Sequence, residues 1–361
     1  MNLLLFAAGL VALVAGAELL VRGASKLALS FGVSPLVVGL TVVAFGTSSP
    51  ELAVSVGSAL KGNTEIALGN VVGSNIFNVL FILGLSALIA PLVVHAQVVR
   101  QEVPIMIGAS LVVLVMALDA RLSPFESGLL LALLVGYTVF LVRQSRAQTQ
   151  ATEQEYADEL PPPAPGAWDS RLPAQLLLIA AGLALLVVGS QWLVDAAIIV
   201  ARSLGVSELV IGLTIVAAGT SMPEVATSVM AAIKGERDIA VGNVVGSNVF
   251  NLLGCLGLAG LVGNGLPVPA AALNFDLWVM AAVALACLPV FMTGREIARW
   301  EGGLFLAYYV AYTAWLLLQA KQHEALSVFS GAMLGFVLPI TVVTLVVMMV
   351  RSGPPKDDAP H

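Results

Sequence analysis

Charged side chains are scarce in this chain. Only 11% of its 361 residues are Asp, Glu, Lys or Arg, whereas 59% are hydrophobic, and the mean hydropathy is +0.98. Such a composition describes a chain that lies mostly in lipid, so we expect the bilayer to be its main surroundings. No basic patch interrupts the apolar sequence, which argues against a nucleic-acid partner, and no feature implies a protein partner.

Cysteine and histidine are also rare. Cys255 and Cys287 both fall in apolar runs, where two buried thiols are predicted to be small packing residues and not a disulfide or a metal site. The three histidines fall in loops or tails, no H-E-x-x-H is present, and no serine is paired with a buried histidine, which argues against an intramembrane protease. We therefore expect neither an enzyme nor a bound cofactor.

Apolar runs long enough to cross a bilayer, which takes about 20 residues, recur along most of the chain. The first run is too long for a signal-peptide core and follows no basic segment, so it is predicted to be retained. The predicted transmembrane spans are 3–22, 34–60, 66–92, 103–119, 124–142, 173–200, 207–233, 239–262, 275–293, 302–320 and 326–350.

The distribution of lysine and arginine predicts the orientation. With the N-terminus outside, twelve of the 16 lysines and arginines fall on the inner side, and only Lys61, Arg121, Arg202 and Lys321 fall on the outer side. This is the positive-inside pattern, so we expect the N-terminus outside and the C-terminus in the cytoplasm, in the plasma (inner) membrane.

The two halves of the chain repeat one another. The stretch "GLTVVAFGTSSPELAVSVGSALKG" is echoed by "GLTIVAAGTSMPEVATSVMAAIKG", and "IALGNVVGSNIFN" by "IAVGNVVGSNVFN". The offset from Glu51 to Glu224 equals the offset from Asn78 to Asn251, so the halves align here without an insertion. The pattern indicates an internal duplication.

Five spans in each half would insert the second copy in the opposite orientation. The sequence therefore predicts an all-α polytopic membrane protein with two inverted-topology repeats of five helices and an extra C-terminal helix, the architecture of many secondary transporters. The predicted segments are a first repeat at 1–142, an acidic and proline-rich cytoplasmic linker at 143–172, a second repeat at 173–320, and the extra helix with a short cytoplasmic tail at 321–361.

Each repeat places a glutamate within an apolar run, directly after a proline. A charge at membrane depth is costly and usually marks a functional site. Pro50 and Pro223 have no N–H, so each is predicted to break its helix and free the carbonyl of Gly46 or Gly219. Such carbonyls are tolerated only where protein or a water-filled cavity satisfies them.

The repeated motifs are rich in the oxygen ligands that hard cations prefer. Calcium takes about 6 to 8 oxygens from carboxylates, carbonyls, amides and waters. Ser74 and Asn78 are four residues apart on one predicted helix face, as are Ser247 and Asn251. The candidate ligands are the carboxylates of Glu51 and Glu224, hydroxyls or carbonyls of Thr47, Ser48, Thr220 and Ser221, and neutral groups of Ser74, Asn78, Ser247 and Asn251.

Other positions of the two repeated motifs have simpler explanations. Gly69, Gly73, Gly242 and Gly246 form G-x-x-x-G patterns, which favour close helix packing without any ligand. Asn75 and Asn248 are predicted either to join the site or to orient its ligands from outside.

Together, "GTSSPE" with "GSNIFN" and "GTSMPE" with "GSNVFN" resemble the two alpha-repeats of the calcium/cation antiporter superfamily, and within it the prokaryotic sodium/calcium exchangers. The resemblance covers both repeats and implies ten helices in two inverted halves, so the eleventh span departs from the pattern. It also implies three sodium ions exchanged per calcium ion, and hence an electrogenic cycle.

The resemblance also implies roles for individual residues. Glu51 and Glu224 match the main calcium ligands, helped by the carbonyls of Thr47 and Thr220. Asn78 and Asn251 match the polar positions at the centre, where some relatives carry an aspartate in place of Asn251. The positions that match sodium ligands are Ser48, Ser74, Ser221 and Ser247, with the carbonyls of Ala44 and Ala217.

We therefore predict a secondary transporter that exchanges sodium for calcium by alternating access. Calcium/proton antiport, or antiport of another cation, is the alternative, because a buried glutamate can also carry a proton. A channel is harder to exclude from motifs alone.

Overall fold

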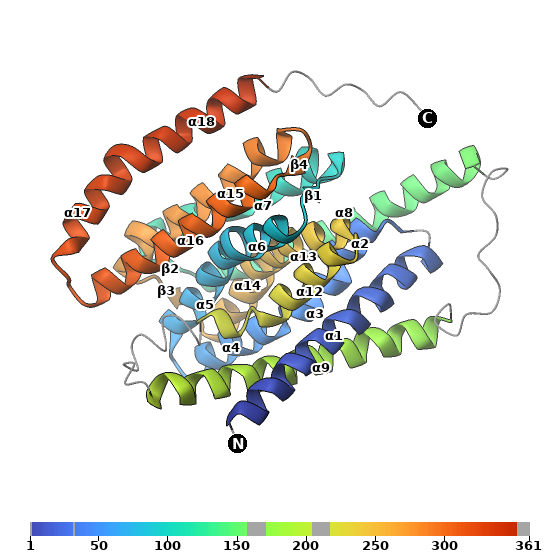
Figure 1. The fold of residues 1–361 in the computed structure, drawn as a ribbon, viewed down its shortest axis with the longest axis horizontal. Helices are drawn as coiled ribbons and strands as arrows, with labels where there is room; N and C mark the ends of the chain where they lie inside the picture. Colours follow the sequence, from blue (N-terminus) through green and yellow to red (C-terminus); the bar gives the residue numbers. More distant parts are fainter. Residues whose placement is uncertain (1, 32, 157–170, 204–216, 352–361) are drawn as a thin grey trace.

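The computed structural model describes residues 2–31, 33–156, 171–203 and 217–351 (Figure 1). In the first half it contains α1 (Asn2–Phe31), α2 (Pro35–Val38), α3 (Ala44–Thr47), α4 (Ser49–Leu60), α5 (Thr64–Phe77), α6 (Gly84–Ile89), α7 (Val103–Met116) and α8 (Pro124–Tyr156). The second half contains α9 (Leu172–Ser203), α11 (Ala217–Gly219), α12 (Met222–Ile233), α13 (Arg237–Phe250), α14 (Leu256–Val262), α15 (Leu277–Met292), α16 (Arg299–Ala320), α17 (Ala325–Ala332) and α18 (Leu338–Arg351).

Several consecutive helices are joined by a π-helical turn and so form one continuous rod. These turns are Gly39–Val43, Asn78–Leu83, Asn251–Cys255 and Met333–Val337, and two further π-helical turns, Val98–Glu102 and Ala272–Asp276, lead into α7 and α15. In the part of the chain that the structure describes, nine rods are long and apolar enough to span a membrane. A tenth span consists of Pro35–Thr47 and Ser49–Leu60, which meet at an angle of 45°.

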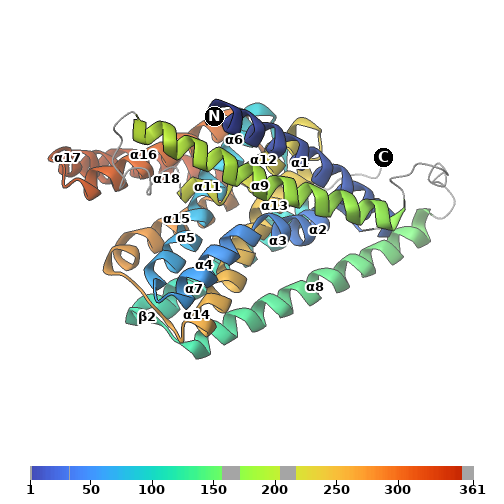
Figure 2. The same cartoon turned by 90° about the horizontal axis from the view of Figure 1, so that it is seen from below.

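These ten spans confirm ten of the eleven predicted from the sequence, and with them the all-α polytopic class. The remaining prediction, 207–233, lies partly outside the described residues; its end forms α12, a short apolar helix. The predicted linker 143–172 begins as helix, because α8 continues to Tyr156 (Figure 2).

The two halves are related by a pseudo-twofold arrangement. Strand β1 (Leu92–Val93) pairs with β4 (Glu296–Ile297), and β2 (Arg121–Leu122) pairs with β3 (Leu266–Pro267). Each pair therefore joins a strand of the first repeat to a strand of the second. The long helices α1 and α9, at equivalent positions in the two repeats, pack along each other (Figures 1 and 2).

Glycines allow this close approach of α1 and α9. A Cβ atom on Gly9 would lie 2.9 Å from the carbonyl oxygen of Gly189, and one on Gly16 would lie 2.8 Å from that of Gly182. Gly182 is the repeat equivalent of Gly9, and Gly189 that of Gly16, so the duplication relates these two contacts to each other. The helices therefore run in opposite directions about a shared axis, as inverted repeats require.

The most buried helices carry the repeated motifs. In the rod Arg237–Val262, 89% of the most apolar 18-residue segment is buried, and in its counterpart Thr64–Ile89 the buried share of that segment is 72%. The predicted close packing is confirmed for Gly242 and Gly246, where an added Cβ would approach the carbonyls of Leu36 and Leu40. The positions equivalent to these two leucines, 209 and 213, lie outside the described residues.

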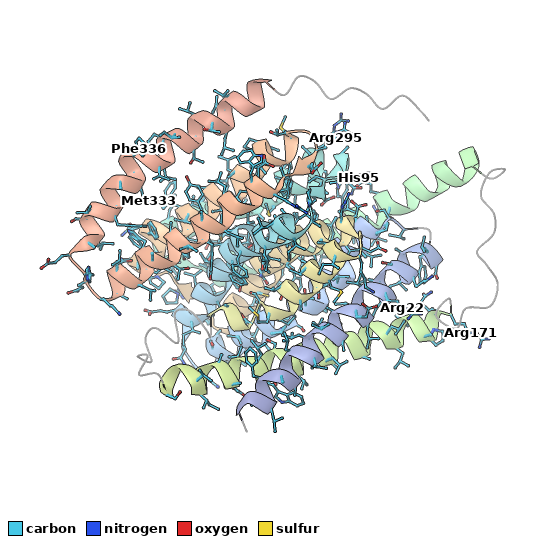
Figure 3. The ribbon with its side chains drawn as sticks, in the orientation of Figure 1. Arg22, His95, Arg171, Arg295, Met333 and Phe336 are labelled. Atoms are coloured by element: carbon cyan, nitrogen blue, oxygen red, sulfur yellow. The ribbon has the colours of Figure 1, made fainter. Side chains whose placement is uncertain are left out.

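Two basic residues that the sequence assigns to the inner side lie at one end of the molecule. Figure 3 shows Arg22 and Arg171 towards the right of the view, where α1 ends and α9 begins, whereas Arg295 lies higher, near His95. On the same predicted side, Lys234 at the end of α12 forms an ion pair with Glu18 of α1.

The C-terminal helix lies along the outside of the bundle. The rod Ala325–Val347 buries none of its apolar window, and Figures 1 and 3 show it at the edge, with Met333 and Phe336 far from α5 and α13. It contacts the bundle through Tyr308, which hydrogen bonds with Thr341, and Trp315, whose Nε1 donates to Ser330 Oγ at 3.2 Å.

Deletion of residues 321–361 should therefore leave the rest of the helix bundle folded. Among the described residues, the deletion removes two side-chain hydrogen bonds to α16, the backbone bonds that end α16, and little buried surface. We therefore expect the midpoint of thermal unfolding in detergent to fall by no more than about 5 °C. Size-exclusion chromatography and a thermal ramp measure this. A truncated chain that is recovered only as aggregate would show that the last helix is part of the core.

Candidate ion-binding site

Two broken helices bring the glutamates to the middle of the bundle. Helix α3 ends at Thr47 and α4 begins at Ser49, with Ser48 between them at φ −81° and ψ 7°. Ser221 has almost the same geometry at the start of α12, with φ −89° and ψ 10°. In both places a proline lies in the first turn of the new helix, where its missing N–H is harmless.

This break places each carboxylate at a helix N-terminus. Glu51 and Glu224 lie in the first turns of α4 and α12, so the partial positive charge of the helix end favours the ionised side chain. Both glutamates are fully buried. The helix dipole thus offsets part of the cost of holding a carboxylate in the protein interior.

The carbonyls that the prolines free are satisfied by protein hydroxyls. Ser49 Oγ donates to the carbonyl of Gly46 at 2.7 Å, and Ser190 Oγ donates to the carbonyl of Gly219 at 2.6 Å. The two donors are not equivalent, because Met222 occupies the position of Ser49 in the second repeat. These two carbonyls are therefore already occupied by protein donors.

Each carboxylate is held by a serine of the opposite repeat. Ser48 Oγ donates to Glu224 Oε1 at 2.9 Å, and Ser221 Oγ is 2.7 Å from Glu51 Oε1. All four side chains are fully buried. Neither half of the chain can build this arrangement alone, because every bond of the pair joins one repeat to the other.

The second oxygen of each carboxylate is left without a hydrogen-bond partner. Within the described residues, the buried oxygens that lack one include Glu51 Oε2, Glu224 Oε2, Asn78 Oδ1 and Ser247 Oγ, which come from both repeats. Ser74 Oγ, by contrast, lies 3.1 Å from Ser221 Oγ. Buried acceptors without a donor are rare in folded proteins, and a bound cation would satisfy these.

The central asparagines lie where two helices change their winding. Asn78 begins the π-helical turn Asn78–Leu83, and Asn251 begins the equivalent turn Asn251–Cys255. Such turns inside α-helices occur frequently at functional sites. Asn248 orients Asn78, since its Oδ1 accepts from Asn78 Nδ2 at 3.0 Å. Asn75 instead donates to the carbonyl of Val71 in its own helix.

The threonine hydroxyls are already engaged by protein groups. Thr47 Oγ1 donates to Asn243 Oδ1 at 3.0 Å, and Thr220 Oγ1 to Asn70 Oδ1 at 3.4 Å. This leaves the threonine carbonyls as the groups available to an ion. The carbonyl of Ala44 already accepts from the Ser48 N–H, which makes it the weakest candidate, and Ala217 is the first residue of α11.

Two asparagines that the sequence analysis missed, Asn70 and Asn243, support the site from outside. Asn70 Nδ2 donates to the backbone carbonyl of Glu51 at 3.2 Å and to Ser55 Oγ at 3.0 Å. Asn243 makes the equivalent bonds to Glu224 and Ser228. With the threonine bond, each asparagine therefore connects the start of a glutamate helix to the opposite repeat.

The sequence contains a signal for these two residues. Both lie in the repeated stretches "IALGNVVGSNIFN" and "IAVGNVVGSNVFN", one helical turn before Ser74 and Ser247. They are related by the same offset along the chain as the two glutamates. Their equivalent positions in the two repeats are enough to identify them from the sequence, although their role as connectors depends on the tertiary contacts.

The assembled cluster is suited to a hard cation. In the described part of the chain, serine hydroxyls are the side-chain donors to the two carboxylates, and no salt bridge neutralises their two charges. No group of three or more His, Cys, Asp or Glu residues that would hold a metal occurs among the described residues. The cluster instead offers carboxylate, hydroxyl and amide oxygens.

Replacing either connecting asparagine should destabilise the protein. In Asn243→Ala or Asn70→Ala, buried hydroxyl and carbonyl groups lose their partners, which costs about 1–3 kcal/mol each. We expect both variants to unfold at a clearly lower temperature in detergent.

Asn63→Ala is the control, because Asn63 is exposed and makes no side-chain bond as the N-cap of α5. Equal unfolding temperatures for all three variants would contradict this role.

The chain is similar to known membrane antiporters. A model of the sodium/calcium exchanger protein family matches residues 1–143 and 174–318. The chain is 39% identical over 312 residues to the putative antiporter CaxA of Alkalimonas amylolytica, covering 84% of this chain and 95% of the relative. It is 35% identical over 340 residues to the sodium/calcium exchanger MaX1 of Methanosarcina acetivorans, covering 86% and 97%.

The fold is also similar to that of a solved exchanger. The structure of the sodium-calcium exchanger NCX_Mj, soaked with sodium and calcium, superimposes with a TM-score of 0.74 at 31% identity, over 87% of this chain and 97% of that one. Sequence, fold and oxygen-rich cluster lead to one assignment. The chain belongs to the sodium/calcium exchanger family, within the calcium/cation antiporter superfamily.

Proposed function

We propose that this protein exchanges sodium for calcium across the membrane by alternating access. The observation that carries the proposal is the pair of fully buried carboxylates, Glu51 and Glu224, each with one oxygen bonded by the opposite repeat and one without a partner. The family supports the same activity, since MaX1 and NCX_Mj are both named sodium/calcium exchangers.

The charges of the site suit exchange of one calcium ion against several sodium ions. Two carboxylates neutralise one calcium ion, so the calcium-loaded site has no excess charge. Three sodium ions, the number implied by the family, would leave one excess positive charge at the same ligands. We therefore propose an electrogenic cycle that moves one net charge.

The cross-repeat bonds suit alternating access. Because each carboxylate is held by a serine of the opposite repeat, a movement of one repeat against the other changes the ligand geometry of both glutamates together. Rocking of inverted repeats about a site at their interface is the common mechanism of such transporters. We propose that the protein acts in the plasma (inner) membrane, with its N-terminus outside and its C-terminus in the cytoplasm.

Calcium/proton antiport is the second candidate function. Carboxylates can carry protons as well as metal ions, and the site contains two of them on facing helix ends. The hydroxyl and amide oxygens around them favour sodium, because a proton carrier has no need for neutral oxygen ligands. The two functions differ in which gradient drives calcium.

Purified protein in liposomes separates these functions. With sodium inside the vesicles, calcium uptake should follow an outward sodium gradient, should not require potassium, and should respond to an imposed membrane potential. Uptake driven by a pH gradient alone would favour proton exchange. Calcium entry without either gradient would indicate a channel and overturn the proposal.

Neutralising either glutamate should nearly abolish exchange. Glu51→Gln and Glu224→Gln keep the side-chain shape but remove a charge that calcium needs. We therefore expect calcium uptake to fall to a few per cent or less of the wild-type value. This loss corresponds to one charged ligand interaction of roughly 2–3 kcal/mol or more. Both variants should remain monodisperse in detergent.

Glu126→Gln is the matched control for these variants. Glu126 accepts from the N–H and Oγ of Ser123 at the start of α8, far along the chain from the site, and glutamine serves equally well at this capping position. Its exchange rate should equal that of the wild type. Folded Glu51→Gln and Glu224→Gln proteins that exchange at the wild-type rate would show that the site is misassigned.

A further inference from the structure

The two central asparagines present opposite chemical groups although the repeat makes them equivalent. Asn78 and Asn251 occupy the same position in the two repeats, are no more than 1% exposed, and begin matching π-helical turns. In the described part of the chain, Asn78 has its oxygen Oδ1 without a partner, whereas Asn251 has its nitrogen Nδ2 without one. The site is therefore asymmetric at its centre.

On the side of Asn78, a neighbouring asparagine explains the orientation. Asn78 Nδ2 donates to Asn248 Oδ1 at 3.0 Å, which leaves the Asn78 oxygen as the open end of the amide. The symmetric bond, from Asn251 to Asn75, is absent among the described contacts. Asn75 Nδ2 donates to the carbonyl of Val71 at 2.8 Å, and its own Oδ1 has no partner.

On the side of Asn251, the neighbour of the amide is a cysteine. The Cys255 thiol lies 3.5 Å from Asn251 Oδ1, at the other end of the same π-helical turn. In the first repeat the equivalent position is Ile82, which has no donor. The fully buried thiol donates to the oxygen of Asn251, which leaves the nitrogen of this amide without a partner.

The open nitrogen lies in the neighbourhood of the ion ligands. The turn Asn251–Cys255 packs against α4 and α5, the helices that carry Glu51 and Ser74. The amide of Asn251 is thus part of the central cluster, and its orientation matters to an ion there.

We propose that Cys255 is a positioning residue that turns the Asn251 side chain so that its amide N–H, and not its oxygen, faces the ion cluster. This inference rests on the proposed function, in which the cluster is the exchange site. The centre then has an oxygen ligand from the first repeat and a hydrogen-bond donor from the second. The cysteine sets this difference between two otherwise equivalent half-sites.

A donor at this position reduces the affinity of the centre for a cation. The N–H edge is the positive end of the amide dipole, so it repels a metal ion and attracts a water molecule or a carboxylate oxygen. If Asn251 turned by half a rotation about its last bond, its oxygen would become an additional neutral ligand. The orientation of one amide therefore tunes how strongly the site holds sodium and calcium.

Replacement of the thiol tests this role. In Cys255→Ala the donor is lost and the Asn251 oxygen can turn towards the ions, so we expect the half-saturating concentrations of sodium and calcium to fall about three- to tenfold, the equivalent of one hydrogen bond. The maximal exchange rate should change less than twofold. Cys255→Ser keeps a donor and should match the wild type.

Cys287→Ala is the matched control. Cys287 is also fully buried, but its thiol donates to the carbonyl of Val283 in its own helix α15. Its affinities should equal those of the wild type. An unchanged ion dependence in Cys255→Ala would overturn the proposal, and so would an equal shift in Cys255→Ser, because the size of the side chain would then be the cause.

A second measurement separates this inference from the proposed function. The thermal unfolding temperature of detergent-purified protein is followed while sodium chloride or calcium chloride is added, with choline chloride as the ionic-strength control. If the wild type transports neither ion but the variants show the expected shifts in ion stabilisation, the positioning role stands and the exchange function falls. Identical ion stabilisation in all four proteins overturns the positioning role, whatever the transport assay shows.

Discussion

The burial of two carboxylates in the membrane interior is the constraint on which the structure depends. Glu51 and Glu224 are fully buried, and an ionised carboxylate in such surroundings needs strong compensation. The structure supplies two helix N-termini, two serine hydroxyls and a set of open oxygens that a cation completes. The helix breaks follow from this need, because an unbroken helix would offer no N-terminus at mid-membrane.

Because the chain is duplicated, each repeat stabilises the buried carboxylate of the other. Each repeat contributes the carboxylate that the other repeat's serine binds, and the threonine that the other repeat's asparagine holds. The site therefore forms only when both halves meet, and a relative motion of the halves acts on every ligand. Departures from symmetry include Cys255 in place of Ile82, Met222 in place of Ser49, and the ion pair of Glu18 with Lys234, which has no acidic counterpart at Gln191.

The helices at the periphery of the bundle are packed differently from those around the site. Helices α1 and α9 approach closely because glycines face each other, whereas the C-terminal helix keeps its apolar side chains on the outside, where lipid can cover them. The family match ends at residue 318, before this helix begins. The oxygen-rich cluster and the extra helix are therefore spatially separate.

The sequence by itself determined the class of protein, ten of the spans, the duplication, and the glutamates, because long apolar runs and a repeated motif can be recognised without knowing any contact. It also identified the helix breaks, since proline removes an N–H wherever it occurs. The tertiary structure alone decided which oxygens remain open, because that depends on partners far along the chain. Gly46 and Gly219 accept from serines at non-equivalent positions, Ser49 and Ser190, and Asn251 is turned by a thiol that Asn78 lacks. Equivalent residues of the two repeats therefore acquire different chemistry.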